Sequence, residues 1–198
     1  MKKCLLPLGE VSDAAYKKWY GLMSESRKAR VDRLTRKDAK RRTVAGEIAA
    51  RRAAAELLGI PPEEITVFSE PGGRPYAEGI YLSISHSGEL AAAAADRSPV
   101  GIDVEKIRPV RLSAAKKVFT PEELFHLFGR EPDSADFGRL PDPETLGRFF
   151  YLWTRHEAWV KRDGRGLRLT PEKKDDSLLE TVRRDGYVIS FARWPGAE

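Results

Sequence analysis

Two carboxylates in the segment VGIDVE, residues 100–105, have the type and spacing of a cation site. If the segment is a strand, alternate side chains share a face, so Asp103 and Glu105 point the same way. The valines and the isoleucine of the segment then point the other way, into a core. Hard oxygen ligands suit Mg²⁺ or Mn²⁺, and a cation would offset the repulsion between the carboxylates. The alternative is an edge strand with ordinary surface charges.

A third carboxylate, Glu157, lies in the apolar and aromatic segment 146–162, whose residue pattern predicts a helix. Such a carboxylate could complete a metal site or act as a general base. Glu157 also precedes Lys161 by one helical turn, so the alternative is a salt bridge along one helix face.

The segment SISHSG places His86 at the end of an expected strand, beside Ser85, Ser87 and Gly88. Imidazolium and hydroxyl groups at such a position could hold a phosphate. A serine–histidine nucleophilic pair is the rival, but neighbouring strand residues face opposite sides, and the sequence has no G-x-S-x-G elbow. A histidine satisfied within a turn is the third alternative. His126 has no comparable neighbours, and we interpret it as structural.

Basic residues are concentrated before these segments. Residues 1–60 hold 15 Lys and Arg against 7 Asp and Glu, whereas residues 61–198 hold 20 against 23. The strongly basic run 27–42 is therefore expected either to meet an anion or to form the solvated face of a helix. Arg74 follows two glycines, which would let the backbone approach a ligand or would simply make a tight turn.

The composition excludes several classes of protein. The 198 residues are 41% hydrophobic and 33% charged, with a net charge of +5, which is typical of a folded chain rather than a disordered one. No apolar run approaches the ~20 residues that span a bilayer, and the start lacks the apolar run of a signal peptide. The single cysteine, Cys4, excludes an internal disulfide and a cysteine-rich metal site. A cytoplasmic location without membrane contact is expected.

Helices are expected in five segments, each with apolar side chains at helical spacing. The first follows a cap at Ser12, and the long, alanine-rich second one opens at Thr35 and ends at Gly59. A loop rich in Gly, Pro and Asp over 129–145 precedes the last. The segments are 12–23, 35–58, 112–118, 121–128 and 146–162.

Strands are expected between and after these helices. The alanine run of 89–96 lies between a Ser-Gly turn and a proline, in a span too short for a stable helix, so we predict a buried strand. The chain closes with a hairpin over 178–194 that turns at Asp185-Gly186. The remaining strand segments are 65–70, 81–88 and 100–105.

Helices and strands therefore recur in two blocks, with a break near Ser98-Pro99. This order predicts an α+β (α/β) chain of two halves, 1–99 and 100–198, each with a small, mostly antiparallel sheet and packed helices. The first half carries the basic run, and the second carries the carboxylates.

Taken in order, the segments GGRPYA, LSISHSGELAAAA, VGIDVE and LWTRHEAWVKRDGRGL resemble the 4′-phosphopantetheinyl transferases, in particular the Sfp-like class. G-I-D-x-E alone is a weak motif. Its combination with the later W-x-x-x-E-A-x-x-K segment and the earlier Ser-His-Ser makes the resemblance specific, and it extends from about Arg27 to Leu169.

The resemblance implies a reaction, its cofactors and its partners. The family moves the phosphopantetheine arm of coenzyme A to a serine of an apo acyl or peptidyl carrier protein and releases adenosine 3′,5′-bisphosphate. Mg²⁺, with Mn²⁺ as an alternative, would hold the pyrophosphate. Two halves in one chain imply a monomer with a pseudo-twofold axis and an active site in the cleft between the halves.

The resemblance also assigns roles to individual residues. Asp103, Glu105 and Glu157 would be the metal ligands, and Glu157 would also assist deprotonation of the incoming serine. Lys161 would contact the phosphate that bridges to the leaving group. The residues that would bind coenzyme A are Arg27 and Arg30 near its 3′-phosphate, Arg42 and His86 at its phosphates, Arg74 near its adenine, and Ser85. Glu123 matches an acidic position of less certain role.

This chain departs from the family pattern in two places. His156 stands where the family usually has a lysine, so any stabilisation of leaving-group charge there should be weaker and pH-dependent. The chain after Leu169 is short, so the second half is expected to end in an abbreviated sheet.

Three rival interpretations are open to test. A basic nucleic-acid-binding module would explain the run 27–42, but the sequence has no RNP, KH or zinc-finger pattern, so we expect no nucleic acid. An inactive coenzyme A or carrier-protein binder would not need the carboxylate set. The smaller trimeric synthases have one half per subunit, whereas this chain contains both.

Overall fold

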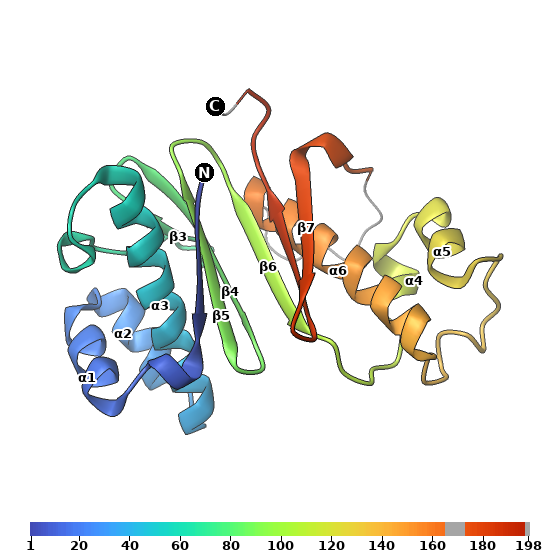
Figure 1. The fold of residues 1–198 in the computed structure, drawn as a ribbon, viewed down its shortest axis with the longest axis horizontal. Helices are drawn as coiled ribbons and strands as arrows, with labels where there is room; N and C mark the ends of the chain where they lie inside the picture. The colour runs from blue at the N-terminus through green and yellow to red at the C-terminus, as the bar shows by residue number, and fades with distance from the viewer. Residues whose placement is uncertain (165–172, 197–198) are drawn as a thin grey trace.

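The structure is a computed structural model that describes residues 1–164 and 173–196. Within these residues the fold is α+β, with two antiparallel sheets side by side and helices packed against them (Figure 1). The predicted fold class is thus confirmed. Strand order is β1-β5-β4-β3-β2 in the first sheet and β6-β8-β7 in the second.

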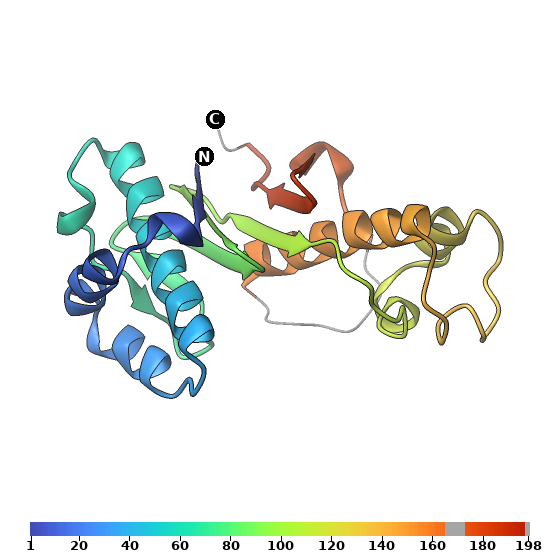
Figure 2. The same ribbon diagram turned by 60° about the horizontal axis from the view of Figure 1, so that its bottom comes forward.

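The first half consists of the five-stranded sheet and three helices. The long helix α3 packs against β1, β4 and β5, and the short helices α1 and α2 lie beside it (Figures 1 and 2). The elements are β1 (Lys2–Pro7), α1 (Asp13–Leu22), α2 (Glu25–Asp32), α3 (Lys37–Leu58), β2 (Phe68–Ser69), β3 (Pro75–Ala77), β4 (Ile80–Ser87) and β5 (Leu90–Asp96), with 3-10 turns at Leu8–Glu10 and Pro62–Glu64.

The second half repeats this plan with fewer strands. The long helix α6 packs against all three strands of its sheet, as α3 does in the first half. The elements are β6 (Gly101–Lys106), α4 (Ala115–Val118), α5 (Pro121–Phe128), α6 (Pro143–Asp163), β7 (Leu179–Arg184) and β8 (Tyr187–Ala192), with a 3-10 turn at Asp176–Leu178.

The two halves share a connectivity. In each, a first strand is followed by helices, the last of which is long, and then by a hairpin whose second strand pairs with the first strand. The order β1-β5-β4 therefore corresponds to β6-β8-β7. This repeat agrees with the expectation of two similar halves, and the three-stranded second sheet agrees with the expected abbreviation.

The alanine run forms strand β5, as predicted, although alanine is a poor strand former. Ala91, Ala93 and Ala95 belong to the core beneath α3, whereas Ala92 and Ala94 belong to a second core shared with β6 and β8. A strand that is covered on both faces at close range accepts only small side chains. Packing on both sides therefore outweighs intrinsic propensity.

Strand β1 was not predicted from the sequence. It pairs with β5 along its whole length, from Lys2 opposite Ala95 to Pro7 opposite Leu90. Its partner lies far along the chain, so no local turn or alternation in KKCLLP indicates the pairing.

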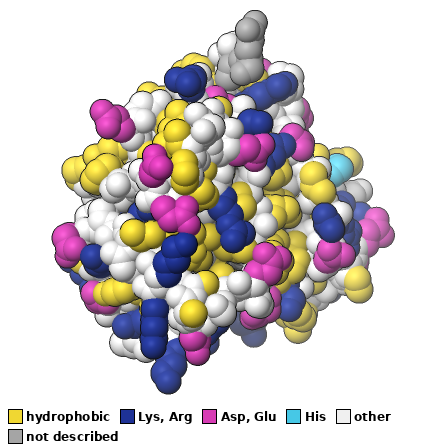
Figure 3. All heavy atoms as spheres, turned by 60° about the vertical axis from the view of Figure 1, so that its left-hand side comes forward, with side chains coloured by type: hydrophobic (Ala, Val, Ile, Leu, Met, Phe, Trp, Pro, Cys, Tyr) yellow, Lys and Arg dark blue, Asp and Glu magenta, His cyan; other side chains and the backbone are white. Residues whose placement is uncertain are grey.

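The basic run 27–42 is divided between two helices, so the alternative of a single solvated helix face is corrected. Helix α2 ends at Asp32 and helix α3 begins at Lys37, so the residues between them divide the basic run. The N-cap of α3 is Arg36 rather than the expected Thr35. Much of the charge of the run is neutralised in place, through the pairs Lys28–Glu25, Arg36–Asp38, Arg41–Asp13 and Arg42–Asp38. In Figure 3, basic and acidic side chains are interleaved on the face that carries α1 and α2, which does not favour a continuous nucleic-acid surface.

The remaining helices agree with the prediction except at their ends. Ser12 caps α1, and α5 spans the predicted 121–128. Helix α6 starts three residues earlier than expected because the Asp142 side chain accepts from the backbone N–H groups of Glu144 and Thr145. Helix α4 covers only the end of 112–118.

The predicted turn of the last hairpin is confirmed, whereas the strand predicted over 65–70 is shorter than expected. The hairpin β7–β8 turns at Asp185 and Gly186, whose φ angles of 51° and 77° suit a two-residue turn. In the segment 65–70, only Phe68–Ser69 forms a strand.

Candidate active site

A cavity of about 600 Å³ lies between the two halves and collects most of the predicted site residues. Its walls come from α2, the glycine turn before β3, strands β4 and β6, and the C-terminal part of α6. The predicted residues that line it are Arg27, Arg30, Arg74, Ser85, His86, Asp103, Glu105, Glu157 and Lys161. Segments distant in the sequence thus converge on one pocket, although the role of each residue stays a prediction.

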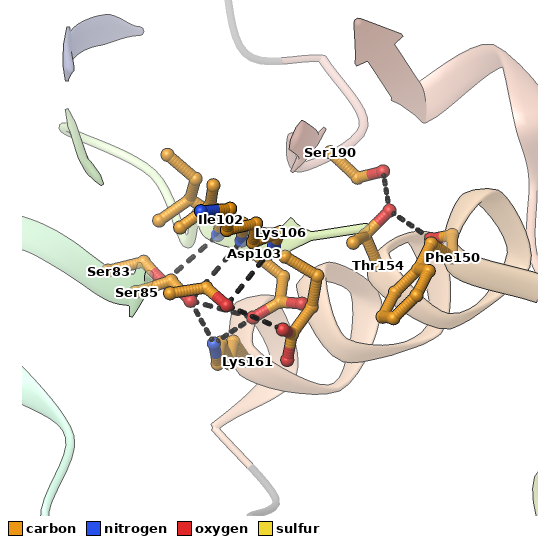
Figure 4. Close-up of polar contacts among 12 residues, drawn as sticks. Ser83, Ser85, Ile102, Asp103, Lys106, Phe150, Thr154, Lys161 and Ser190 are labelled. Atoms are coloured by element: carbon orange, nitrogen blue, oxygen red, sulfur yellow. Dashed lines mark hydrogen bonds and ion pairs between the residues drawn. The ribbon is translucent and has the colours of Figure 1, made fainter. Parts of the chain in front are cut away.

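Lys161 and Asp103 form the closest charged contact in this cavity (Figure 4). The Lys161 ammonium donates to Asp103 Oδ1 at 2.6 Å and to Ser85 Oγ at 3.2 Å, while Ser85 donates to the same carboxylate oxygen at 2.7 Å. Among the described residues Lys161 makes no ion pair with Glu157. The alternative of a helix salt bridge is therefore wrong, because the ammonium turns towards β6 instead.

The three carboxylates are poorly hydrated and repel one another. Burial, followed by the negative charge of Asp103, raises the pKa of Glu157 to about 7. Burial also raises the pKa of Glu105, although a hydrogen bond from Ser87 acts in the opposite direction. Asp103 Oδ2 and Glu157 Oε1 are buried and accept no hydrogen bond. This electrostatic arrangement favours a positive ligand.

The donor atoms of this site are of the type that binds a divalent cation, but they are not yet arranged as a complete set of metal ligands. Two buried, unpartnered carboxylate oxygens are hard donors of the kind that Mg²⁺ and Mn²⁺ bind. Yet among residues 1–164 and 173–196, no three Asp, Glu, His or Cys side chains already converge as metal ligands. An ion would compete with the Lys161 ammonium for Asp103. The assignment of Asp103, Glu105 and Glu157 as ligands stays a prediction.

The raised pKa of Glu157 predicts a pH-dependent stability for the metal-free protein. In the unfolded chain this carboxyl loses its proton near its ordinary pKa of 4.5, whereas in the folded protein it keeps the proton until about pH 7. Its contribution to the free energy of unfolding is thus complete below pH 4.5 and is lost as the pH rises to about 7. Urea unfolding in EDTA at several pH values should show that Glu157→Gln removes this part of the decline.

A Glu157→Gln profile parallel to that of the wild type across this range would contradict the raised pKa. Glu64→Gln is a suitable control, because Glu64 is an exposed glutamate of the first half that does not line the cavity. Its profile should follow the wild type.

His86 lines the cavity, and part of its side chain is exposed to solvent. Burial and the positive charges of Arg42, Lys161 and Arg30 lower its pKa below 6.5. The lowered pKa disfavours the imidazolium form of His86 in the ligand-free protein. A neutral imidazole still provides one N–H donor for a phosphate oxygen.

Arg27 is held by a buried ion-pair network rather than left free at the surface. Its Nε donates to Glu47 Oε2 at 2.9 Å, and Arg51 Nε donates to the other oxygen of Glu47 at 3.1 Å. All three side chains are buried. Arg30 is more exposed than Arg27, and its pKa is lowered by partial desolvation and by the charge of Arg27. Both arginines face the cavity, but only Arg27 is fixed in place.

Arg74 ties the glycine turn to the end of α6. Its Nη2 donates to the carbonyl of Arg162 at 3.0 Å, and its guanidinium lies 5.2 Å from the ring centre of Tyr81. A Cβ at Gly164 would come within 2.5 Å of Arg74 Nη1, so this glycine leaves room for the arginine. The position agrees with a residue that lines the cavity, although contact with adenine stays a prediction.

Two predicted residues do not line the cavity. Arg42 pairs with Asp38 at 2.9 Å on the exposed side of α3, although its charge still acts on His86. His156 is fully buried within α6 and is absent from the cavity wall. A side chain in that position does not reach a ligand in this cavity, which argues against direct stabilisation of leaving-group charge by His156.

Glu123 has a structural role. Its carboxylate accepts from the backbone N–H of Thr120 at 2.9 Å, while Thr120 Oγ1 accepts from the backbone N–H of Glu123, which forms a capping box at the start of α5. Glu123 also pairs with Lys174 at 2.8 Å.

A second cavity of about 650 Å³ lies between α5, α6 and the β7–β8 hairpin. Its charged groups are largely paired with one another, as in Arg148–Glu144 and Arg155–Asp176. It lacks the unpartnered carboxylate oxygens of the first cavity, so we place the chemistry in the first.

Buried hydroxyl groups fix α6 against the second sheet. Thr154 donates to the carbonyl of Phe150 at 2.9 Å and lies 2.7 Å from Ser190 Oγ (Figure 4). Ser190 Oγ in turn lies 2.9 Å from Thr181 Oγ1. Ser190 is opposite Asp103 in the strand register. The chain of hydroxyls therefore sets the position of the helix that carries Glu157 and Lys161.

Sequence reasoning missed several residues of the site. Ser83, Thr43, Trp153 and the turn glycines Gly72 and Gly73 also line the cavity. Ser83 could have been found from the sequence, because positions 83, 85 and 87 alternate along the strand and therefore share one face of β4. Of these three serines, only Ser85 was named as a binding residue. For Thr43 and Trp153 the sequence contains no comparable signal.

Comparison with known proteins decides the family. Residues 99–194 match the profile of the 4′-phosphopantetheinyl transferase superfamily, and residues 10–98 match the profile of a 4′-phosphopantetheinyl transferase N-terminal region. A 4′-phosphopantetheinyl transferase of Bacillus subtilis is 30% identical over 179 residues, which cover 86% of this chain and 75% of that protein. The chain belongs to the 4′-phosphopantetheinyl transferase superfamily. Because each half matches its own profile, it belongs to the two-half, Sfp-like class.

Other relatives agree with this family. HetI, a 4′-phosphopantetheinyl transferase of Nostoc, is 31% identical over 86% of this chain and 78% of its own length. Sfp of Bacillus subtilis is 26% identical over 90% of this chain and 75% of its own length. The solved Helicobacter pylori holo-[acyl-carrier-protein] synthase in complex with coenzyme A covers 48% of this chain and 96% of its own, with 16% identity and a TM-score of 0.38, which is too weak a likeness to support an argument.

None of the helices in the described part of this transferase-family chain has the length and apolar character needed to cross a bilayer.

Proposed function

We propose that this chain transfers the 4′-phosphopantetheine arm of coenzyme A to a serine of an apo acyl or peptidyl carrier protein. The other product would be adenosine 3′,5′-bisphosphate. The observation that carries the proposal is the single cavity in which Asp103, Glu105 and Glu157 meet Lys161 and Arg30, in a chain of this superfamily.

The basic groups of this cavity suit the charge of coenzyme A. Arg27, Arg30 and Lys161 are cations that would offset the negative charge of its phosphate groups. His86 would add a hydrogen-bond donor from the cavity wall. Phosphoryl transfer depends mainly on charge neutralisation and in-line positioning, which these side chains would provide.

The chemical step forms one phosphorus–oxygen bond and breaks another. The carrier serine Oγ would attack the phosphorus that bears the pantetheine arm, and the bond from that phosphorus to the bridging oxygen would break. The serine proton would pass to the carboxylate of Glu157, which lines the same cavity. Lys161 would stabilise the charge that develops on the bridging oxygen.

Asp103, Glu105 and Glu157 would hold Mg²⁺ or Mn²⁺, which when bound would neutralise the pyrophosphate charge. The cation would also relieve the repulsion among the carboxylates. Lys161 would then be released from Asp103 to contact the phosphate. The role of Asp103 as a metal ligand and the role of Lys161 as a phosphate contact are linked in this way.

Intact-mass measurement of a carrier protein tests the proposal. Apo acyl and apo peptidyl carrier proteins, incubated with this chain, coenzyme A and Mg²⁺, should each gain about 340 Da, the mass of the transferred arm. A carrier protein whose acceptor serine is replaced by alanine is the control and should gain nothing. Unchanged masses across several carrier proteins of both types would overturn the proposal.

A further inference from the structure

Strand β4 of the first sheet and strand β6 of the second are joined by serine side chains (Figure 4). Three hydroxyl oxygens of β4, from Ser83, Ser85 and Ser87, accept hydrogen bonds from alternate backbone N–H groups of β6. The donors are Ile102, Val104 and Lys106, at 3.0, 3.3 and 3.1 Å. Each donor lies 19 positions after its acceptor, so the two strands run parallel in register.

We call these three hydrogen bonds the serine ladder. In each of them the serine oxygen accepts, so the single hydrogen of the hydroxyl group is free to be donated to another acceptor. Ser85 donates to Asp103 and Ser87 donates to Glu105 Oε2, both at 2.7 Å. The corresponding residue opposite Ser83 is Gly101, which has no side chain to receive a hydrogen bond. Two of the three serines therefore orient carboxylates, and Ser83 makes the ladder bond alone.

The two carboxylates depend on their serines to different degrees. Asp103 also receives the Lys161 ammonium at 2.6 Å, so loss of Ser85 would leave a strong partner in place. Among the described residues, Ser87 is the hydrogen-bond partner of Glu105, and its nearest cation, Arg108, lies 3.9 Å away and is largely exposed. The orientation of the Glu105 carboxylate thus rests mainly on Ser87.

We propose that Ser87 is a positioning residue that orients the Glu105 carboxylate for binding of a divalent cation. It accepts from the Lys106 N–H and donates to Oε2, which ties the carboxylate to the backbone of its own strand. Partners of this kind, behind a ligand, commonly change metal affinity 10- to 100-fold when removed. This inference rests on the proposed function and adds a residue to its site.

Binding of Mn²⁺ to the protein saturated with coenzyme A tests the inference without a catalytic assay. Electron paramagnetic resonance reports the free hydrated ion, and titrations of coenzyme A alone correct for binding to the nucleotide. Ser87→Ala should raise the dissociation constant for Mn²⁺ about 10-fold, and Ser87→Thr, which keeps the hydroxyl, should restore it to within about 2-fold. In transfer assays Ser87→Ala should raise the KM for Mg²⁺ and leave kcat at saturating Mg²⁺ nearly unchanged.

Ser83→Ala is the matched variant, because it removes a ladder bond of the same type without touching a carboxylate. It should shift the Mn²⁺ dissociation constant less than about 2-fold, which separates carboxylate positioning from loosening of the strands. Equal losses in Ser83→Ala and Ser87→Ala would overturn the inference, as would wild-type Mn²⁺ affinity in Ser87→Ala. A wild-type protein that modifies no carrier protein would instead overturn the proposed function.

Discussion

Asp103→Asn is expected to lower the rate of phosphopantetheine transfer about 10³-fold. The substitution keeps the shape and the Oδ1 acceptor that Ser85 and Lys161 use, but it removes the negative charge that would hold the cation. It also removes the partner charge of Lys161. The mass gain of the carrier protein, followed over time at saturating coenzyme A and Mg²⁺, measures this loss.

The asparagine variant is preferable to alanine because Asp103 is only 4% exposed. Alanine would leave Lys161 and Ser85 without their shared acceptor. Asp103→Asn should melt within about 3 °C of the wild type, and the exposed Glu64→Gln should keep full activity. Near-normal transfer by a folded Asp103→Asn protein would exclude Asp103 as a metal ligand.

Gly101→Ala is expected to destabilise the fold by at least about 3 kcal/mol. A Cβ at this position would lie 1.9 Å from the carbonyl oxygen of Ala158 and 2.7 Å from the amide nitrogen of Arg162. Both atoms belong to the backbone of α6, so no side-chain rotation can relieve the clash. Strand β6 and helix α6 would have to separate.

The separation should also reduce activity beyond the loss of folded protein, because β6 carries Asp103 and α6 carries Lys161. Thermal unfolding should show a decrease of roughly 6–12 °C in Tm for 3 kcal/mol. Gly21→Ala is the matched substitution, since nothing lies within 4 Å of its new Cβ in α1 and it should stabilise by up to about 1 kcal/mol. If Gly101→Ala were as stable as the wild type, the close contact between β6 and α6 would be wrong.

The residues of the site were largely accessible from the sequence, because their signals are local. Alternation in VGIDVE indicates that Asp103 and Glu105 share a face, and the strand β6 confirms it. The cap at Ser12, the start of α5 and the turn at Asp185-Gly186 are likewise determined by neighbouring residues. The alanine strand β5 could be predicted only from its flanking turns, against its own propensity.

What the sequence could not determine depends on contacts between distant segments. Strand β1 exists because β5 lies beside it, and the Arg27–Glu47 pair exists because α2 packs on α3. Desolvation in the assembled cavity gives Glu157 its raised pKa and His86 its lowered one.

The sequence by itself determined the family motifs, the faces of the strands and the types of charged group. The tertiary structure alone decided that Lys161 pairs with Asp103 rather than Glu157, that His156 is buried away from the cavity, and that serines connect the two halves. The physical reason is that pairing and desolvation depend on distances between side chains, and only the packing of β4, β6 and α6 sets those distances.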